Sequence, residues 1–437
     1  MKLQRTPIVR TLSVMYLLIF IGLALYDETL QTDVAEFLKV PPASVPDAEN
    51  AYFAQLGFSA PPGTDIQSFG IATYRKALDE AAKKRAGNMK EVPTKSADSS
   101  QISFKGKELP NDKLYQFATD PSSTLDILAK DNAELLTRYH VLRRYRQIEE
   151  PGGNGHYQDV PIPAFTPIRS AQSLTLLLAL RSAQEGKPDE ALAVLVDDMT
   201  YWRGILRQSH ILIGKMIAIA CIQKDYQVLS ELIAHHDLSD QQRTQVRALL
   251  PPWKNDDANF GEAARYEAQY VTESLFVSLP THGLLDGLFL KKNASMNTLV
   301  RFHIENSRIS KLTAEEFYRS LAIQQKDQKD LARLHPDFLY NPVGAILNSI
   351  AVPQLSSYFS RFHDLEAKRR MVLVHLMARE QGIGHDGMPK LLKESGREFA
   401  NPYTGQPMQW NAGKKSIVMD SIPSQGKAEQ RRVELVL

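Results

Sequence analysis

Apolar residues recur every three to four positions along most of the chain, which is the spacing of amphipathic helices. Two stretches carry this pattern clearly, with apolar positions at Leu125, Leu128, Leu135, Leu136 and Leu142 in the first and at Leu355, Tyr358, Phe362, Leu365, Val372 and Leu376 in the second. Residues 371–377 are apolar on nearly all sides, so this half of the second helix should be central to the core. The pattern predicts a mainly α-helical protein.

Between residues 169 and 250 the pattern indicates paired helices joined by short turns. The phrase Gly186-Lys187-Pro188-Asp189-Glu190 is typical of the turn in tetratricopeptide-like helix pairs, and residues 222–229 repeat its shape about one hairpin later. Neither unit carries the full repeat signature, and two units are too few for a solenoid. We therefore expect helical hairpins here, either tetratricopeptide-like or ordinary.

The end of the chain changes from a helical to a β pattern. Residues 408–410 and 416–419 flank a turn at Asn411-Ala412-Gly413, which is typical of a hairpin. Residues 432–437 have the sequence RVELVL and suit a further strand. We expect a small C-terminal antiparallel β-hairpin or three-stranded sheet, packed on the helical body.

The longest uncharged apolar stretch runs from Thr11 to Tyr26. At ~1.5 Å rise per residue, a helix from Ile8 to Tyr26 would span roughly 28 Å, close to the ~30 Å core of a bilayer. Basic residues precede the stretch and acidic residues follow it, which places the following chain outside the cytoplasm. We expect a single-pass anchor in a bacterial inner membrane with the body in the periplasm. A cleaved signal peptide is the alternative, because small residues suit a cleavage site at Gly22 and Ala24.

These patterns divide the chain into segments with different expected roles. They are a cytoplasmic N-terminus (1–10), the anchor or signal segment (11–26), a spacer (27–46), an N-terminal helical region (47–149) with a mobile loop at 86–121, a Pro/Gly linker (150–168), a helical body (169–400) and a β-hairpin tail (401–437).

Composition narrows the classes of function. Hydrophobic content of 43% and charged content of 23% are those of a globular protein. A net charge of +2 gives no long-range field suited to nucleic acid, so we expect no nucleic-acid partner. Cys221 is the only cysteine of the sequence, which excludes an intrachain disulfide and a metal site built on cysteines.

Two stretches carry residue types suited to a ligand. Arg143, Arg144 and Arg146 follow one another at the end of a predicted helix. They suit an anion-binding or membrane-surface patch, or simply a solvated helix end whose dipole favours cations. His156 and Tyr157 lie in the 150–168 segment, which is long and irregular and is therefore either a linker or a functional loop.

Motifs of well-known enzymes are missing from the sequence. It contains no H-E-x-x-H zinc motif, no G-x-S-x-G nucleophile elbow and no Walker phosphate loop. His235 and His236 are adjacent and would diverge by about 100° on a helix, so they suit a metal poorly. We expect no metal and no cofactor, and no catalytic residue can be named.

Three segments resemble sequences of other bacterial proteins. They are residues 47–63, residues 340–370 and the phrase NPYTGQP at 401–407, which continues to Trp410. The last resembles the "DPxTGxP" tail that ends a number of exported bacterial proteins, with Asn401 in place of the usual Asp. Together the segments resemble an uncharacterised family of N-terminally membrane-anchored proteobacterial proteins. The resemblance implies an envelope location and brings no known activity or catalytic residue.

The phrase at 401–407 also has a physical interpretation. Pro402, Gly405 and Pro407 suit a tight turn, Thr404 can bond back to the backbone, and Trp410 can pack the hairpin on the helices. We expect a structural clamp, with a binding loop as the alternative.

Two functions fit these observations. The first is a non-catalytic scaffold or adaptor that binds an envelope protein or a cell-wall component. The second is a hydrolase that acts on a cell-envelope polymer. An enzyme needs a concave pocket where titratable residues converge, whereas an adaptor needs an apolar or charged groove without such convergence.

Overall fold

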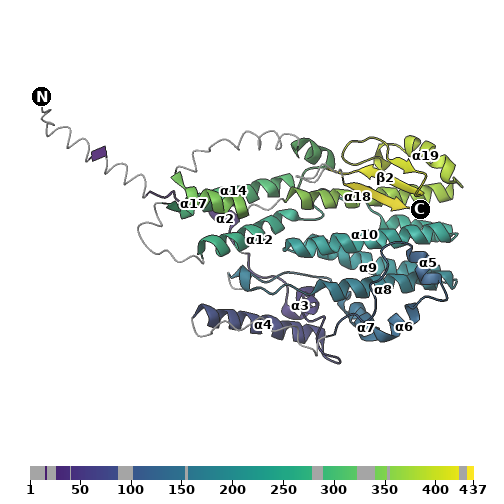
Figure 1. The fold of residues 1–437 in the computed structure, drawn as a ribbon, viewed down its shortest axis with the longest axis horizontal. Coiled ribbons are helices and arrows are strands. Elements are labelled where there is room, and N and C mark those ends of the chain that lie inside the picture. Colours follow the sequence, from purple (N-terminus) through teal and green to yellow (C-terminus); the bar gives the residue numbers. More distant parts are fainter. Residues whose placement is uncertain are drawn as a thin grey trace.

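The chain folds into stacked helices with a small sheet at the C-terminal end (Figure 1). The computed structural model describes residues 15–16, 26–39, 41–86, 102–152, 156–277, 289–321, 340–351, 355–422 and 431–437. The predicted fold class, mainly helical with a C-terminal three-stranded antiparallel sheet, is confirmed.

The stretch from Leu125 to Leu142 forms two helices that meet at Asn132 and not one, and other described helices lie where the helical periodicity predicts them. The described helices include α2 (Thr32–Phe37), α3 (Ala51–Leu56), α4 (Ile66–Arg85), α5 (Leu114–Thr119), α6 (Leu125–Asp131), α7 (Ala133–Leu142), α8 (Phe165–Gln184), α9 (Pro188–Gln208), α10 (Leu212–His235), α11 (Asp240–Leu249), α12 (Phe260–Thr272), α14 (Lys292–Ile309), α17 (Pro342–Ala351), α18 (Ser356–Glu380) and α19 (Met388–Glu394).

Helix α10 lies at the centre of the stack. It packs against α8 and α9 on one side and against α18 on the other, and these helices run side by side in Figure 1. The turn between α8 and α9 uses Gly186 at φ 86°, a conformation that costs glycine little, and Pro188 then begins α9 at a position where its missing N–H is not needed. The helical hairpins expected between residues 169 and 250 are therefore present.

The sheet covers one side of α18 and touches α10. Its strands are β1 (Gln409–Asn411), β2 (Ser416–Asp420) and β3 (Arg432–Val436), all paired antiparallel in the order β1-β2-β3. Gln409 pairs with Val418, and Ser416 pairs with Val436. Strand β2 is buried over four of its five residues because it lies between its two neighbours and above the helices.

The expected membrane location is corrected by the structure. Nearly all of residues 11–26, together with the predicted cytoplasmic residues 1–10, lie outside the described residues. Within the described residues, no helix is both long enough and apolar enough to cross a bilayer. The long described helices carry charged residues along their length, as α18 does with Arg369 and Lys368 near its middle. The prediction of a single-pass inner-membrane protein with a periplasmic body is therefore not upheld.

The predicted spacer and the predicted mobile loop both contain helices. The predicted spacer at 27–46 includes α2, which packs against α14. The Asp27 carboxylate accepts hydrogen bonds from the backbone N–H groups of Asn293 (2.8 Å) and Ala294 (3.1 Å) in the first turn of that helix. Of the loop expected at 86–121, residues 87–101 lie outside the described residues, and the remainder contains α5.

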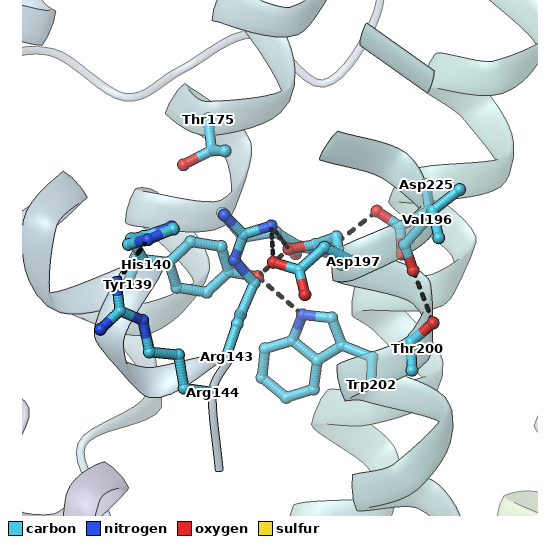
Figure 2. A network of polar contacts seen from close by, with 12 residues as sticks. Tyr139, His140, Arg143, Arg144, Thr175, Val196, Asp197, Thr200, Trp202 and Asp225 are labelled. Carbon is cyan, nitrogen blue, oxygen red and sulfur yellow. Dashed lines mark hydrogen bonds and ion pairs between the residues drawn. The ribbon is translucent and has the colours of Figure 1, made fainter. Parts of the chain in front are cut away.

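A buried polar network connects α7, α8, α9 and α10. Trp202 Nε1 donates to the Tyr139 hydroxyl (2.8 Å), and that hydroxyl donates to Asp198 Oδ1 (2.5 Å). Gln172 Nε2 donates to Asp198 Oδ2 (2.7 Å) and to Asp225 Oδ1 (3.3 Å). Figure 2 shows Tyr139 and Trp202 pointing toward one another in this network. The hydrogen bonds fix the register of four helices in the core.

Asp198 and Asp225 form a coupled pair of carboxyl groups inside this network. Both are fully buried, and burial raises the pKa of each. The charge of Asp198 and a hydrogen bond between the two carboxyls raise the pKa of Asp225 further. Arg143 and the donors Tyr139 and Gln172 oppose this rise in the pKa of Asp198. A proton shared by the pair therefore favours Asp225, whose pKa the charge of Asp198 raises.

The backbones of α3 and α4 approach very closely at two glycines. A Cβ atom on Gly70 would lie 1.8 Å from the Phe53 carbonyl oxygen, and one on Gly57 would lie 1.9 Å from the Ile66 carbonyl oxygen. Only glycine fits at these points. Gly204, in the interior of α9, has open space instead, because its Cβ would meet only Gln208 Nε2 at 3.7 Å.

We predict opposite effects for alanine at two helical glycines. Gly70→Ala should lower the free energy of unfolding by roughly 2–4 kcal/mol, because α3 and α4 must move apart. Gly204→Ala should raise it by up to about 1 kcal/mol through helix propensity. Urea denaturation of both variants measures the difference, and a neutral Gly70→Ala would contradict the close packing.

We predict that Asp225→Asn stabilises the protein increasingly as pH rises. The folded state holds the Asp225 proton more tightly than the unfolded state does. The contribution of this group to the free energy of unfolding is therefore fully present below about pH 3.9, and it is lost as the pH rises toward the pKa of Asp225 in the folded state. An amide removes this loss and still donates to Asp198. Denaturation curves at about pH 5 and about pH 8 should show a larger gain at the higher pH, of about 1 kcal/mol or more.

Asp198→Asn is the matched control for that experiment. Its amide nitrogen would face groups that donate to Asp198, and Arg143 would lose a charged partner. We expect a loss of about 2 kcal/mol or more at both pH values. Equal effects of the two amides would mean that the proton does not reside on Asp225.

Candidate functional site

Part of the predicted Pro/Gly linker forms the wall of a cavity. Residues 153–155 lie outside the described residues, and the 3-10 helix η3 (Tyr157–Asp159) follows them. We call residues 156–162 the 156–162 segment. Three contacts hold it in place: His156 Nδ1 lies 2.7 Å from Glu273 Oε1, Asp159 pairs with Arg85, and the Pro161 carbonyl accepts from the Tyr52 hydroxyl (2.7 Å). The segment is thus fixed from α4, α3 and the end of α12.

Glu273, which contacts the 156–162 segment, lies where α12 changes into a π-helical turn. It begins η4 (Glu273–Val277), a π-helical turn that directly continues α12. Its side chain is buried, and its Oε2 atom also accepts a weak bond from the Gln158 backbone N–H (3.4 Å). A π-helical turn is wider than an α-helical turn, so it changes the direction in which the side chains after α12 point. Such turns are frequent at functional sites.

A cavity of about 260 Å³ lies beside this segment. We call it the tyrosine pocket, because four of the residues that line it are tyrosines. The full set is Tyr52 from α3, Tyr157, Val160, Pro161 and Ile162 from the 156–162 segment, Ile211 and Ile213 from the start of α10, and Tyr266, Glu267 and Tyr270 from α12. Four parts of the sequence that lie far apart therefore build one hollow.

Tyr157 is the most informative residue of the tyrosine pocket. It is only 5% exposed, and its hydroxyl has no hydrogen-bond partner among the described residues. Its ring stands edge-on to the ring of Tyr266, with centroids 4.8 Å apart. Burial, together with the charge of Glu273, raises the pKa of Tyr157 to about 12, so the hydroxyl stays protonated. A buried hydroxyl without a partner costs about 1–3 kcal/mol, which a ligand that hydrogen-bonds to it would recover.

The mouth of the tyrosine pocket is apolar and open to solvent. Ile162 is 66% exposed, and Ile213 and Tyr270 are each 43% exposed. Glu267 is the only carboxylate among the described lining residues. Burial raises its pKa, although the Leu212 backbone N–H at the start of α10 donates to it. An exposed apolar rim around a hollow with few polar groups is typical of a binding site.

A second, smaller hollow lies on the other side of Tyr157 and Tyr266. It is lined by charged residues, but its carboxylates already have structural partners. Glu149 accepts from the Ser44 backbone and hydroxyl (2.8 and 2.9 Å), and these bonds, with that of Val45, hold its pKa low against the effect of burial. Glu150 accepts from the Ser209 hydroxyl and the His210 backbone N–H, both at 2.5 Å.

Lys215 is buried close to this second hollow. Burial lowers its pKa to about 7, although the charges of nearby carboxylates raise it. Its ammonium group donates to the carbonyls of Leu206 (2.8 Å) and Ala258 (2.6 Å), so it connects the end of α9 with the chain before α12. The hydrogen bonds give Lys215 a structural role.

The carboxylates near the tyrosine pocket are few, and most are paired with other described residues. No group of three or more His, Cys, Asp or Glu side chains among them is placed to hold a metal ion. The carboxylates around the second hollow are held by backbone and hydroxyl donors, and the tyrosine pocket contributes one carboxylate. The geometry of this region suits binding of an apolar group with one or two polar contacts.

The three predicted arginines do not act as one group. Arg143 is buried and pairs with Asp197 (3.0 Å) and Asp198 (3.7 Å), while Arg146 also pairs with Asp197 (2.9 Å). Arg144 is exposed and contacts His140 (3.0 Å), as Figure 2 also shows. Two of the three charges are thus neutralised by α9. A binding role for these arginines stays a prediction.

The predicted turn residues lie at the base of the sheet. The Gly405 N–H donates to the Asn401 carbonyl (2.8 Å), and Gly405 has φ 67°, a value that favours glycine. The Gln406 N–H donates to Thr404 Oγ1 (3.2 Å). Trp410 pairs with Ile417 of β2, and the centroid of its ring lies 5.6 Å from that of the His385 ring. Pro402 and Pro407 flank this turn, and a cavity of about 240 Å³ adjoins it at Pro407.

Sequence reasoning located part of the pocket and missed the rest. His156 and Tyr157 were candidates because they lie in a long irregular segment, and the structure places Tyr157 in the pocket wall and His156 on Glu273. Tyr52, Ile213, Tyr266 and Tyr270 were not candidates. They lie in amphipathic helices, where an apolar or aromatic residue looks like any core residue.

Comparison with protein-family models, with curated proteins and with solved structures finds no match to this chain. The functional argument therefore depends on the geometry of the molecule itself.

Proposed function

We propose that the protein is a non-catalytic adaptor that binds a segment of a partner polypeptide in the tyrosine pocket. One observation carries the proposal: the buried Tyr157 hydroxyl lacks a partner in the wall of an apolar cavity whose rim exposes Ile162, Ile213 and Tyr270. A partner that fills the cavity would cover these apolar side chains and supply a hydrogen bond to Tyr157. Both effects favour association.

The lining residues define the chemistry of the bound segment. Tyrosine rings and isoleucines suit one large aliphatic or aromatic side chain, because aromatic faces pack well against such groups. Glu267 adds a single negative charge in a half-buried place. A lysine or arginine next to the apolar residue would neutralise this charge. We therefore expect a motif that contains a large apolar residue beside a basic one.

The number of available carboxylates favours binding over hydrolysis. Most glycoside hydrolases use two carboxyl groups that face each other across the bond to be cleaved. The described lining of the tyrosine pocket offers Glu267 alone, and the nearby Glu149 and Glu150 are engaged by hydrogen bonds. No specific observation supports the hydrolase alternative.

We predict that a peptide library displayed on phage and selected on the full-length protein yields one consensus, an aliphatic or aromatic residue beside Lys or Arg. A synthetic peptide with that consensus should bind the wild type. Ile162→Glu should weaken its binding about tenfold or more, because a carboxylate on the apolar rim would lose its hydration when the large apolar residue of the peptide covers it. Fluorescence anisotropy with a labelled peptide measures this.

Ile127→Glu is the matched control. Ile127 lies on α6, is 62% exposed, and does not line the pocket. It should bind the peptide as the wild type does. A peptide that binds equally to Ile162→Glu and Ile127→Glu, or a selection without any consensus, would contradict the proposed site.

A further inference from the structure

A second cavity, of about 440 Å³, lies between α10, α18 and β3. We call it the basic cavity. One side is formed by Met216, Ile219, Ala220 and Gln223, which follow one face of α10. The other sides are formed by Arg361, Asp364 and Lys368 of α18 and by residues 431–434. The cavity therefore has an apolar wall opposite a charged one.

Both acidic residues of the basic cavity are already engaged. Asp364 pairs with Arg431, and its Oδ1 atom accepts from the hydroxyls of Tyr403 (2.8 Å) and Ser421 (2.7 Å). Glu434 accepts from the Ser416 hydroxyl (2.6 Å) and pairs with Lys414 (3.2 Å), which lies outside the cavity. Neither carboxylate is left to neutralise the other cations.

Two cations of the basic cavity lack a carboxylate partner among the described residues. Arg361 and Lys368 are seven residues apart on α18, so they project from the same face two turns apart. Arg361 lies over the ring of Tyr358, 5.8 Å from its centroid, and no ion pair among the described residues includes Arg361 or Lys368. Arg432, by contrast, has the exposed Asp420 at 3.7 Å.

The electrostatic environment agrees with an excess of positive charge. Burial lowers the pKa of Lys368. Burial also lowers the pKa of Arg431, and the charge of Arg361 lowers it further. On the next turn of α10, burial and the charge of Arg169 lower the pKa of Lys224 to about 8, and Lys368 adds to this effect. Cations held this closely favour an anion between them.

We propose that the basic cavity binds a phosphate monoester. Arg361 and Lys368 would neutralise the dianion, and Arg431, held in place by Asp364, would add hydrogen bonds. A guanidinium group can form bidentate hydrogen bonds with two oxygens of a phosphate, and a lysine ammonium adds a positive point charge. The hollow is larger than one phosphate ion needs, and its apolar α10 wall suits the carbon part of an ester.

The contrast with the predicted arginine patch at residues 143–146 supports this site. There, Asp197 and Asp198 neutralise Arg143, and Asp197 pairs with Arg146 as well. In the basic cavity, two cations on one helix face have no such partner. The carboxylates of the basic cavity, Asp364 and Glu434, are paired with other groups, so Arg361 and Lys368 keep an uncompensated positive charge.

We test the proposal by titrating full-length protein with inorganic phosphate, glycerol phosphate, hexyl phosphate and hexanoate, with isothermal calorimetry as the readout. Hexyl phosphate should bind to the wild type, and Arg361→Gln and Lys368→Gln should each lower the affinity for hexyl phosphate about tenfold. Arg144→Gln is the matched control, because it removes the same charge from an exposed arginine that also lacks a carboxylate partner among the described residues. It should change affinity less than about twofold.

The arms of the titration also identify the source of the phosphate group. Tighter binding of hexyl phosphate than of glycerol phosphate would indicate an ester with an apolar chain, such as a lipid. Equal binding of the two would indicate a polar metabolite. Three results would each overturn the proposal. They are no binding of any of the phosphate compounds, binding of hexanoate as tight as that of hexyl phosphate, and equal losses of affinity in Arg361→Gln and Arg144→Gln. The peptide experiment on the tyrosine pocket is independent of all these outcomes.

Discussion

The structure depends on covering helix α10. The first half of this helix is apolar on nearly every side, so it is stable only when other elements surround it. Helices α8 and α9 cover one side and α18 covers another, while β3 reaches its remaining face. Figure 1 shows α10 between these layers. Burial of this one helix therefore determines which segments of the chain meet, including those that form both cavities.

Placing α10 in the core also buries the carboxyl group of Asp225. An isolated charge there would be very costly, and the network around Asp198 avoids it by sharing one proton between two carboxyls. Tyr139, Trp202 and Gln172 complete the network from three other helices. Such a network tolerates little sliding of one helix against another, because each displaced donor would leave a buried acceptor unpaired.

The two cavities lie along the same helix and have different chemistry. At the start of α10, Ile211 and Ile213 face tyrosine rings and a single carboxylate. One turn later, Met216 and Ile219 face the cations of α18 and β3. A hollow of the first kind selects an apolar group, whereas the second selects an anion with an apolar part. An adaptor with the two proposed sites would join a polypeptide and a phosphorylated ligand through the two cavities along α10.

The sequence by itself determined the helical class, the turn at Gly186 and Pro188, and the strands near residues 409–436, because these follow from local periodicity and turn chemistry. It also singled out Tyr157, since a long irregular segment stands out locally. It did not determine location: the anchor expected at residues 11–26 was inferred from hydropathy, and no described helix supports a membrane span. Only the tertiary structure decided which charges are neutralised. Arg143 lies 54 residues before Asp197 and forms an ion pair with it, whereas Arg361 and Lys368 form no ion pair with a carboxylate among the described residues. Ion pairing and cavity walls are set by residues far apart in the chain, and local patterns carry no information about such contacts.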